Sequence, residues 1–324
     1  MMRSEPLLAG LSCDQLRRGL TDAGIEGSHA FIRTLDADYD RGIRVDALLS
    51  TLRPDDDLRF VVGSGDTECW VLAERLPWDS EFFGRGIARL NAVVRPSKRR
   101  ELRADVSPEV DAVDRVLDVA RSRGIDYVFA QVDAIDLPTI RMLSASGFEL
   151  IESRCHYHRP LVDAPVVRHP CRLATPDDAP SLARTAREMV NPFDRFHADP
   201  AIAPADADRL MERWVHASLS SAFADATIVP DDPQPEAFCT ARYHKEHWTG
   251  WKLNLAQPVL SAVSPRHKGW YVKIISELDE HLRSIGAEHS FLITQLTNNA
   301  VIRCWEKLGY QFGKGEHVFR RVLP

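Results

Sequence analysis

The sequence predicts an α/β protein made of two tandem α/β domains, and three observations lead to that fold class. The chain has 324 residues, which at about 150 residues per domain is room for two domains. Displaced by 162 residues (283 minus 121), the chain matches itself without a gap, so that Arg121 falls on Arg283 and Gly147 on Gly309. Helical and strand patterns alternate within each copy, which favours mixed central sheets with some parallel pairing.

The two copies have the same order of elements. Ser107 with Pro108 is typical of a helix start, and Gly124 of a helix end. The first copy is expected to form a helix over 107–124, a strand over 127–132, a helix over 136–147 and a strand over 148–161. The second copy is expected to form a helix over 269–284, a strand over 290–294, a helix over 298–308 and a strand over 310–322.

These patterns divide the chain into three regions. Residues 1–58 are expected to be a helical N-terminal extension with two helices and no assigned chemistry. Residues 59–162 are expected to form a first, degenerate domain, and residues 171–324 a complete second domain. The proline-bearing segment 163–170 is suited to a linker between them.

Composition excludes several classes of function. Forty-one Lys and Arg residues against 47 Asp and Glu give a net charge of −6, which argues against nucleic acid as the partner. No stretch approaches the roughly 18 apolar residues of a membrane span, and the apolar run Pro6–Leu11 is too short for a signal peptide. Six cysteines without a CxxC spacing predict reduced thiols in a cytoplasmic protein and no metal site. The pair His244 and His247 supplies too few ligands for zinc, and its surroundings are typical of an exposed hairpin turn.

One loop has the character of an anion site. A buried-strand pattern over 259–263 is followed by a turn and then by an amphipathic helix. A helix N-terminus presents free backbone N–H groups to a pyrophosphate, Gly269 lets the backbone approach closely, and Arg266 and Lys268 add positive charge. At the corresponding place in the first copy the glycine is replaced by Ser107, and Asp105 adds negative charge. The sequence therefore predicts one anionic cofactor, bound by the second copy.

The same loop resembles a motif of the GNAT acyltransferase superfamily, Arg/Gln-x-x-Gly-x-Gly/Ala, here running from Arg266 to Tyr271. The segment from Asn298 to Tyr310 resembles the family pattern Asn-x-x-Ala-x-x-x-Tyr-Glu-Lys-x-Gly-Phe. The resemblance implies a GNAT-like fold in both halves, acetyl-coenzyme A as co-substrate and transfer of its acetyl group to an amine. The residues that it implies for coenzyme binding are Ala262, Val263, Arg266, His267, Lys268, Gly269, Trp270, Tyr271 and Asn298.

Position 305 departs from the family pattern. The resembling enzymes have a tyrosine there, near the coenzyme sulfur, as general acid, whereas the Trp305 indole N–H can donate a hydrogen bond but does not give up its proton at pH 7. Three interpretations follow. The thiolate leaves unaided or is protonated by water, Tyr271 or Cys304 substitutes as the acid, or the protein binds the coenzyme and catalyses poorly.

A narrower resemblance concerns the acceptor. Leu76–Gly84, and Arg195–Asp199 followed by Trp214, are similar to segments of TDP-fucosamine acetyltransferase and related nucleotide-sugar N-acetyltransferases, in which the first half also lacks the coenzyme loop. This implies an amino sugar carried on a nucleotide as acceptor. The candidate substrate-binding residues are Arg195, Phe196 and Asp79, and His197 is the candidate base.

The sequence thus predicts an acetyl-coenzyme A-dependent N-acyltransferase with a small-molecule amine acceptor bound where the two halves meet. Two alternatives stay open. One is a GNAT enzyme that acts on another small amine or on a protein amino terminus. The other is a non-catalytic or weakly catalytic acyl-coenzyme A-binding module, for which Trp305 is the main argument. A homodimer is a further expectation.

Overall fold

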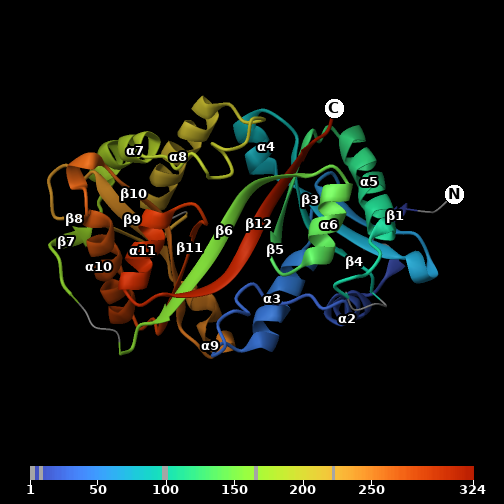
Figure 1. Ribbon diagram of the computed structural model, residues 1–324, viewed down its shortest axis with the longest axis horizontal. Coiled ribbons are helices and arrows are strands. Elements are labelled where there is room, and N and C mark those ends of the chain that lie inside the picture. The colour runs from blue at the N-terminus through green and yellow to red at the C-terminus, as the bar shows by residue number, and fades with distance from the viewer. Residues whose placement is uncertain (1–3, 7–9, 97–100, 164–166, 221–222) are drawn as a thin grey trace. The chain divides into compact units, whose positions relative to one another are not determined.

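The computed structural model describes residues 4–6, 10–96, 101–163, 167–220 and 223–324 (Figure 1). It divides into two compact units. Unit 1 comprises Met1–Ala30, Ala37–Glu152 and Gly315–Pro324, and unit 2 comprises Phe31–Asp36 and Ser153–Lys314. The middle of the expected linker and part of the N-terminal apolar run lie outside the described residues.

Unit 1 is built on a mixed sheet with the strand order β1-β2-β3-β4-β5-β12. The strands are β1 (Ser4–Pro6), β2 (Asp57–Val62), β3 (Cys69–Arg75), β4 (Ile87–Val94), β5 (Tyr127–Asp133) and β12 (Gln311–Val322). Among the described strands of this unit, β4 and β5 run parallel, paired from Ile87 with Tyr127 to Leu90 with Ala130. The connection between them is α5, as expected for a parallel pair.

Helices cover both faces of this sheet. The helices are α2 (Cys13–Asp22), α3 (Ala37–Leu49), α4 (Pro77–Phe83), α5 (Ser107–Ser122) and α6 (Leu137–Ala145). Side chains alternate along β3, so Val71 packs under α5 and α6, whereas Trp70 and Leu72 pack against α2 and α3. The two N-terminal helices, which are present as expected, therefore form one layer of unit 1. The strand β1 was not expected.

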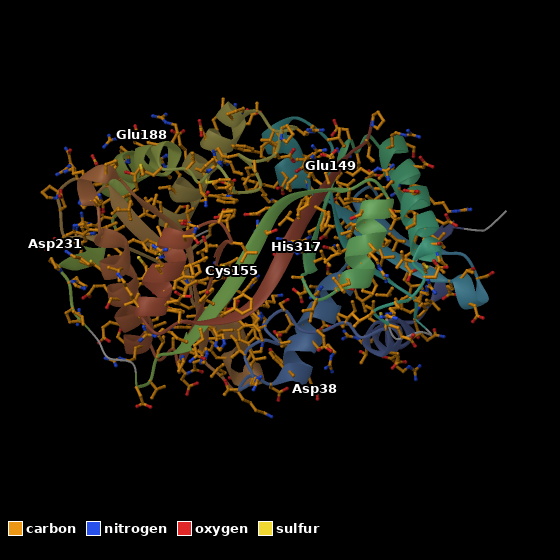
Figure 2. All side chains as sticks on the ribbon, viewed as in Figure 1. Asp38, Glu149, Cys155, Glu188, Asp231 and His317 are labelled. Atoms are coloured by element: carbon orange, nitrogen blue, oxygen red, sulfur yellow. The ribbon has the colours of Figure 1, made fainter. Side chains whose placement is uncertain are left out.

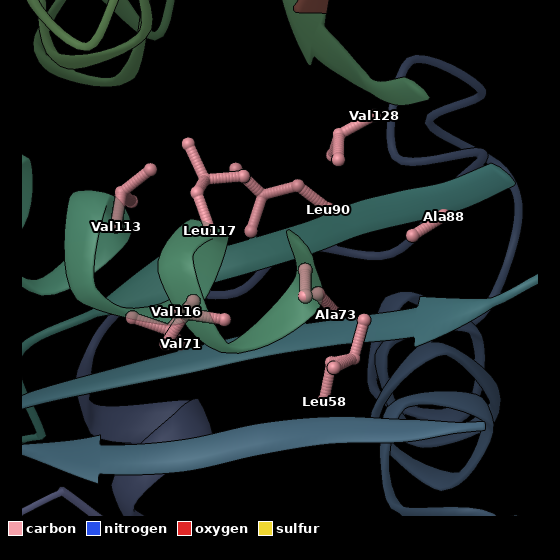
Figure 3. A pocket seen from close by; sticks show the side chains of 10 residues that line it. Leu58, Val71, Ala73, Ala88, Leu90, Val113, Val116, Leu117 and Val128 are labelled. Carbon is pink, nitrogen blue, oxygen red and sulfur yellow. The ribbon is translucent and has the colours of Figure 1, made fainter. Parts of the chain in front are cut away.

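An apolar pocket lies beneath α5 (Figure 3). Its ten lining residues come from α5 and from four strands: Leu58, Val71, Ala73, Ala88, Leu90, Val113, Val116, Leu117, Ala120 and Val128. The pocket has no polar group in its lining and belongs to the core of unit 1. We treat it as imperfect packing between α5 and the sheet.

Within unit 2 the strand order is β6-β11-β10-β9-β8-β7, with parallel and antiparallel pairs. The strands are β6 (Glu149–Pro160), β7 (Cys171–Leu173), β8 (Ala226–Pro230), β9 (Ala237–Arg242), β10 (Leu255–Val263) and β11 (His289–Gln295). The helices are α7 (Ala179–Glu188), α8 (Pro204–Leu219), α9 (Trp248–Trp251), α10 (Trp270–Ser284) and α11 (Asn299–Lys307). The helices α10 and α11 cover the face that carries Cys155 of β6 (Figure 2). The helix α7 contacts β9 and β10, and α8 contacts β8.

The elements of the two copies coincide at the predicted displacement. Adding 162 to the bounds of β5 gives those of β11, and the same holds for α6 with α11 and for β6 with β12. The register repeats as well, because Tyr127 pairs with Val322 and His289 pairs with Pro160. The expected helices and strands of both copies are confirmed to within one or two residues at their ends.

The last strand of each copy pairs outside its own copy. The strand β6 follows α6 in the chain, yet it lies antiparallel to β11 of unit 2. The strand β12 follows α11, and its residues from Glu316 onward lie antiparallel to β5 of unit 1. Each sheet therefore contains a strand from the other half of the sequence.

A pair of arginines shows that the exchanged strands are equivalent. Arg159 of β6 donates to the Leu308 carbonyl at the end of α11, and Arg321 of β12 donates to the Ser146 carbonyl at the end of α6. Leu308 and Ser146 are themselves 162 residues apart. Each arginine also forms an ion pair with the long helix of its unit, Arg159 with Asp279 and Arg321 with Asp114.

Candidate functional site

The parallel strands of unit 2 pair over a short stretch. Only Leu255 with His289 and Ala256 with Ser290 are paired, although β10 continues to Val263 and β11 to Gln295. In unit 1 the corresponding parallel pair extends over four residues. Beyond Ala256, the backbone groups on the facing edges of β10 and β11 have no partner in the pairing of these two strands. This is where an extended ligand can add backbone hydrogen bonds.

The strand β10 also changes register within this stretch. Its pairing with β9 shifts between Pro258 and Ser261, which marks a bulge. Inside the bulge the Leu260 N–H donates to Thr240 Oγ1 at 3.0 Å. The two predicted coenzyme contacts on this strand, Ala262 and Val263, follow the bulge and pair with Phe238 and Ala237 of β9. Bulges commonly aim backbone groups near active sites.

The predicted anion loop leads directly from β10 into α10. A short 3-10 turn, Pro265–His267, is followed by Gly269 at φ +85°, a conformation that favours glycine. Gly269 is the N-cap residue of the fifteen-residue helix α10, and no side-chain hydrogen bond caps this helix. The first N–H groups of α10 are thus free of a side-chain cap and lie at the positive end of the helix dipole.

The basic residues of the loop differ in whether a carboxylate lies near them. Arg266 is held by two carboxylates, at 3.3 Å from Asp232 and 3.7 Å from Glu236. The buried His267 also faces Asp232, at 3.7 Å. Lys268 is exposed, and within the described chain it has no acidic partner. Lys268 is therefore the loop residue with an uncompensated positive charge, whereas the charge of Arg266 is largely offset.

The equivalent position in unit 1 is already occupied by a carboxylate. Asp105 Oδ1 accepts hydrogen bonds from the Ser107 N–H at 3.0 Å and the Ser107 hydroxyl at 2.7 Å. These bonds hold the pKa of the Asp105 carboxyl below its ordinary value. The start of α5 thus carries an anion of its own chain, as the sequence had suggested.

Two further predicted coenzyme contacts lie at the starts of α10 and α11. Trp270 is the first residue of α10, and the Lys273 ammonium lies 4.7 Å from the centre of its ring. Asn298 is the N-cap residue of α11, but its side chain does not cap the helix. Instead, Asn298 Nδ2 donates to Thr294 Oγ1 of β11 at 3.1 Å. Asn298 is thus the N-cap residue by position only, because its side-chain amide is bonded to the strand.

Trp305 is buried in the core under α10 and α11. Its ring lies 5.6 Å from that of Tyr157, and only 2 % of its surface is exposed. Its indole N–H donates a hydrogen bond to the Tyr271 hydroxyl at 2.9 Å. Burial raises the pKa of the Tyr271 phenol, and hydrogen bonds from Trp305 and Ser261 oppose that rise.

The predicted base is enclosed by two carboxylates. His197 Nδ1 lies 2.7 Å from Asp194 Oδ2, and His197 Nε2 lies 3.1 Å from Asp208 Oδ1 of α8. Both ring nitrogens of His197 are thus engaged with carboxylates of the chain itself, and its role as a base stays a prediction. His197 joins the loop after α7 to α8 in this structure.

The other predicted substrate residues lie in separate units. Arg195 covers the ring of Phe196 at 4.3 Å, and the buried Phe196 packs edge-on against Trp214 of α8 in unit 2. Asp79 lies in the first turn of α4 in unit 1, next to the stacked pair Trp78 and Phe82. Their role in substrate binding stays a prediction.

The segment around His244 is not a simple hairpin turn. It connects the antiparallel strands β9 and β10 through a 3-10 turn and the short helix α9. His244 has φ +55° and its ring stacks over Phe291 of β11. The predicted connection between two strands is present, but it contains a helical turn around the buried Trp251 that the local polarity did not indicate.

Sequence reasoning missed the residues that β6 contributes to unit 2. Arg154 and His156 lie opposite Gln295 and Ile293 of β11, so they share the sheet face away from Trp305. Asn191 of the loop after α7 donates to Gln295 on that face at 2.7 Å. The strand exchange placed Arg154 and His156 here, and no local motif in the sequence signals it.

Within the described ranges, no three His, Cys, Asp or Glu side chains are grouped so as to hold a metal ion. All six cysteines lie in these ranges, and none of them forms a disulfide. No helix among the described residues has the length and apolar character needed to cross a bilayer.

Several solved structures have a similar architecture. A tandem GNAT protein from the clavulanic acid biosynthesis pathway superposes with a TM-score of 0.57 at 16% identity, over 99% of this chain and 98% of that one. The chain has the tandem GNAT fold. A GCN5-related N-acetyltransferase from Sphaerobacter thermophilus, at 11% identity, gives a TM-score of 0.61 over 99% of this chain and 95% of that one.

A third similar structure of the GNAT fold is the GCN5-related glucosamine N-acetyltransferase region of a fungal multi-domain GH3 β-N-acetylglucosaminidase. It has a TM-score of 0.65 at 14% identity, over 99% of this chain and 38% of that one. No family model matches the sequence, and a search of curated proteins finds no significant match. At these identities the similarity is one of fold.

Proposed function

We propose that unit 2 binds acetyl-coenzyme A and transfers its acetyl group to a primary amine, and that unit 1 binds no coenzyme. The observation that carries this proposal is the difference between two equivalent sites. Unit 2 combines separated parallel strands, a helix start without a side-chain cap and the exposed Lys268. Unit 1 has Asp105 at the same place.

The loop and the strand supply different parts of the chemistry. The N–H groups at the start of α10 and the charge of Lys268 are suited to the coenzyme pyrophosphate. The backbone of β10 after Ala256 is suited to the extended arm of the coenzyme, and a strand N–H there is the candidate donor to the thioester carbonyl. Polarising that carbonyl favours attack by a neutral amine.

For the acceptor we propose an amino sugar, and in particular one carried on a nucleotide. The support comes from the segment Leu76–Gly84, which resembles nucleotide-sugar N-acetyltransferases, and from the fold similarity to a glucosamine N-acetyltransferase region. Because a tandem GNAT protein from the clavulanic acid biosynthesis pathway is also similar in fold, the acceptor test includes other small amines and peptide amino termini.

Two measurements test the proposal. Calorimetry measures the binding of acetyl-coenzyme A, and a thiol-release assay measures turnover with glucosamine, nucleotide-linked amino sugars, aminoglycosides and short peptides. We expect binding with one coenzyme per chain, and thiol release with at least one amino sugar. Absence of binding at millimolar coenzyme would refute the proposal. Binding without thiol release from any acceptor would favour the non-catalytic module.

A matched pair of variants tests the one-site statement. Gly269→Asp places a carboxylate at the start of α10, in a backbone conformation that only glycine adopts readily, and is expected to abolish coenzyme binding. Ser107→Asp makes the same change at the equivalent position of α5 and is expected to leave binding unchanged. Equal losses in the two variants would contradict the proposal of a single coenzyme site.

A further inference from the structure

The two departures from the GNAT motifs contact each other. The first motif ends in Tyr271 where the family has a small residue, and the second has Trp305 where the family has tyrosine. These positions are 34 residues apart in sequence, on α10 and α11, and their side chains share a hydrogen bond of 2.9 Å. Unit 2 thus has a phenol hydroxyl next to position 305, but the phenol belongs to Tyr271 of α10 and not to a residue of α11.

The direction of this hydrogen bond decides what Tyr271 can do. The indole N–H has no lone pair to accept with, so Trp305 donates and the Tyr271 oxygen accepts. The proton of Tyr271 is therefore not used by Trp305 and is available to another acceptor. Ser261, which also hydrogen-bonds to Tyr271, lies on β10 directly after the bulge.

The surroundings hold the pair in one arrangement. Trp305 is fully enclosed and its ring packs against Tyr157 of β6, which in turn bonds to Glu306. Tyr271 packs against the same core cluster. A buried indole with few rotamers fixes the position of the phenol oxygen, which is the requirement for a group that must meet a ligand atom at hydrogen-bond distance.

We propose that the Tyr271 hydroxyl donates to the coenzyme sulfur as the thiolate leaves, and that Trp305 is its positioning residue. This rests on the proposed function. In the step, the amine nitrogen bonds to the acetyl carbon, the C–S bond breaks and its electron pair stays on sulfur. Tyr271 donates a hydrogen bond or its proton to that sulfur. The amine loses one proton to solvent, and solvent returns one to Tyr271 if it was transferred.

The test needs no acceptor, because it compares coenzyme A with desulfo-coenzyme A, which lacks the sulfur. Calorimetry at pH 7 and pH 9 gives the affinity ratio of the two ligands for the full-length protein and its variants. In the parent protein we expect the ratio to rise with pH, because a donor to sulfur favours the thiolate. Tyr271→Phe should lower the ratio at pH 9 about tenfold, since one hydrogen bond to a charged group is lost.

Three variants separate positioning from general damage. Trp305→Phe keeps a buried ring but removes the N–H, and we expect it to lower the same ratio less than Tyr271→Phe does. In the double variant the Trp305 change should have no further effect. Tyr243→Phe is the control, because it removes another phenol hydroxyl of unit 2 that bonds to His281. It should leave the ratio unchanged.

The outcomes are distinguishable. If coenzyme A does not bind, the proposed function is wrong and this inference is wrong with it. If both ligands bind and the ratio in Tyr271→Phe equals that of the parent at both pH values, only the role of Tyr271 is refuted. Additive losses in the double variant would refute the positioning role of Trp305.

Discussion

Arg159 of β6 and Arg321 of β12 allow the strand exchange to be tested by measuring protein stability. Arg159 and Arg321 occupy the same position of the repeat, but their burial differs. The side chains of Arg159 and its partner Asp279 are 6% and 8% exposed, against 30% and 49% for Arg321 and Asp114. Replacement of each arginine by Met keeps the apolar stem and removes the charge.

The structure gives the two variants different costs. Breaking a buried ion pair costs about 3–5 kcal/mol because a charge is left unpaired. Burial raises the pKa of Asp279 to about 7 even beside Arg159, so without the arginine this carboxyl takes up a proton and the cost stays near the lower end, about 3 kcal/mol. Arg321→Met loses an exposed ion pair and one bond to a carbonyl, about 1–2 kcal/mol.

Amide hydrogen exchange followed by mass spectrometry measures the local stability of each unit separately. Arg159→Met is expected to speed exchange in α10 and β11 of unit 2, although residue 159 belongs to the first half of the sequence. Arg321→Met is expected to speed exchange in α5 and β5 of unit 1. The reasoning fails if Arg159→Met loosens α5 and β5 instead, or if the two variants lose equal stability in urea unfolding.

Two further predictions concern the cores. Burial and the neighbouring His158 lower the pKa of His289 to about 4. As the pH falls below 6.5, His289 therefore takes up a proton in the unfolded chain before it does so in the folded one. Stability should therefore drop between pH 6.5 and pH 4, by up to about 3 kcal/mol, and His289→Gln should flatten this slope in urea titrations; an unchanged slope would assign it to other groups. In unit 1, Leu117→Ala enlarges the existing apolar pocket. It should lower the free energy of unfolding, measured in urea, by about 3 kcal/mol or more. A loss below about 1 kcal/mol would show that the core collapses into the space.

Much of the local structure was predictable because it depends on short-range signals. The side chain of Asp136 accepts from the Thr139 N–H at the start of α6, and glycines at 124 and 147 have positive φ where the helices were expected to end. The contrast between the two loops also followed from charge alone, since Asp105 and Lys268 stand at nearly equivalent positions. Such features are decided by a few neighbouring residues.

What could not be predicted depends on contacts between distant segments. Nothing local distinguishes β6 from a strand that pairs within its own copy, so the position of Arg154 and His156 in unit 2 was out of reach. The carboxylates around His197 come from the same loop and from α8, and their approach depends on how that helix packs. The contact between Tyr271 and Trp305 joins two helices and needed the tertiary structure.

The strand exchange limits how freely the first half can change. At the start of α5 it has Ser107 at the position equivalent to Gly269, and Asp105 beside it. Its final strand, β6, is paired along seven residues with β11 of unit 2. A deletion that removed the first half would leave β11 with an open edge and the buried Asp279 without Arg159. The first half of the sequence thus supplies a structural part of unit 2.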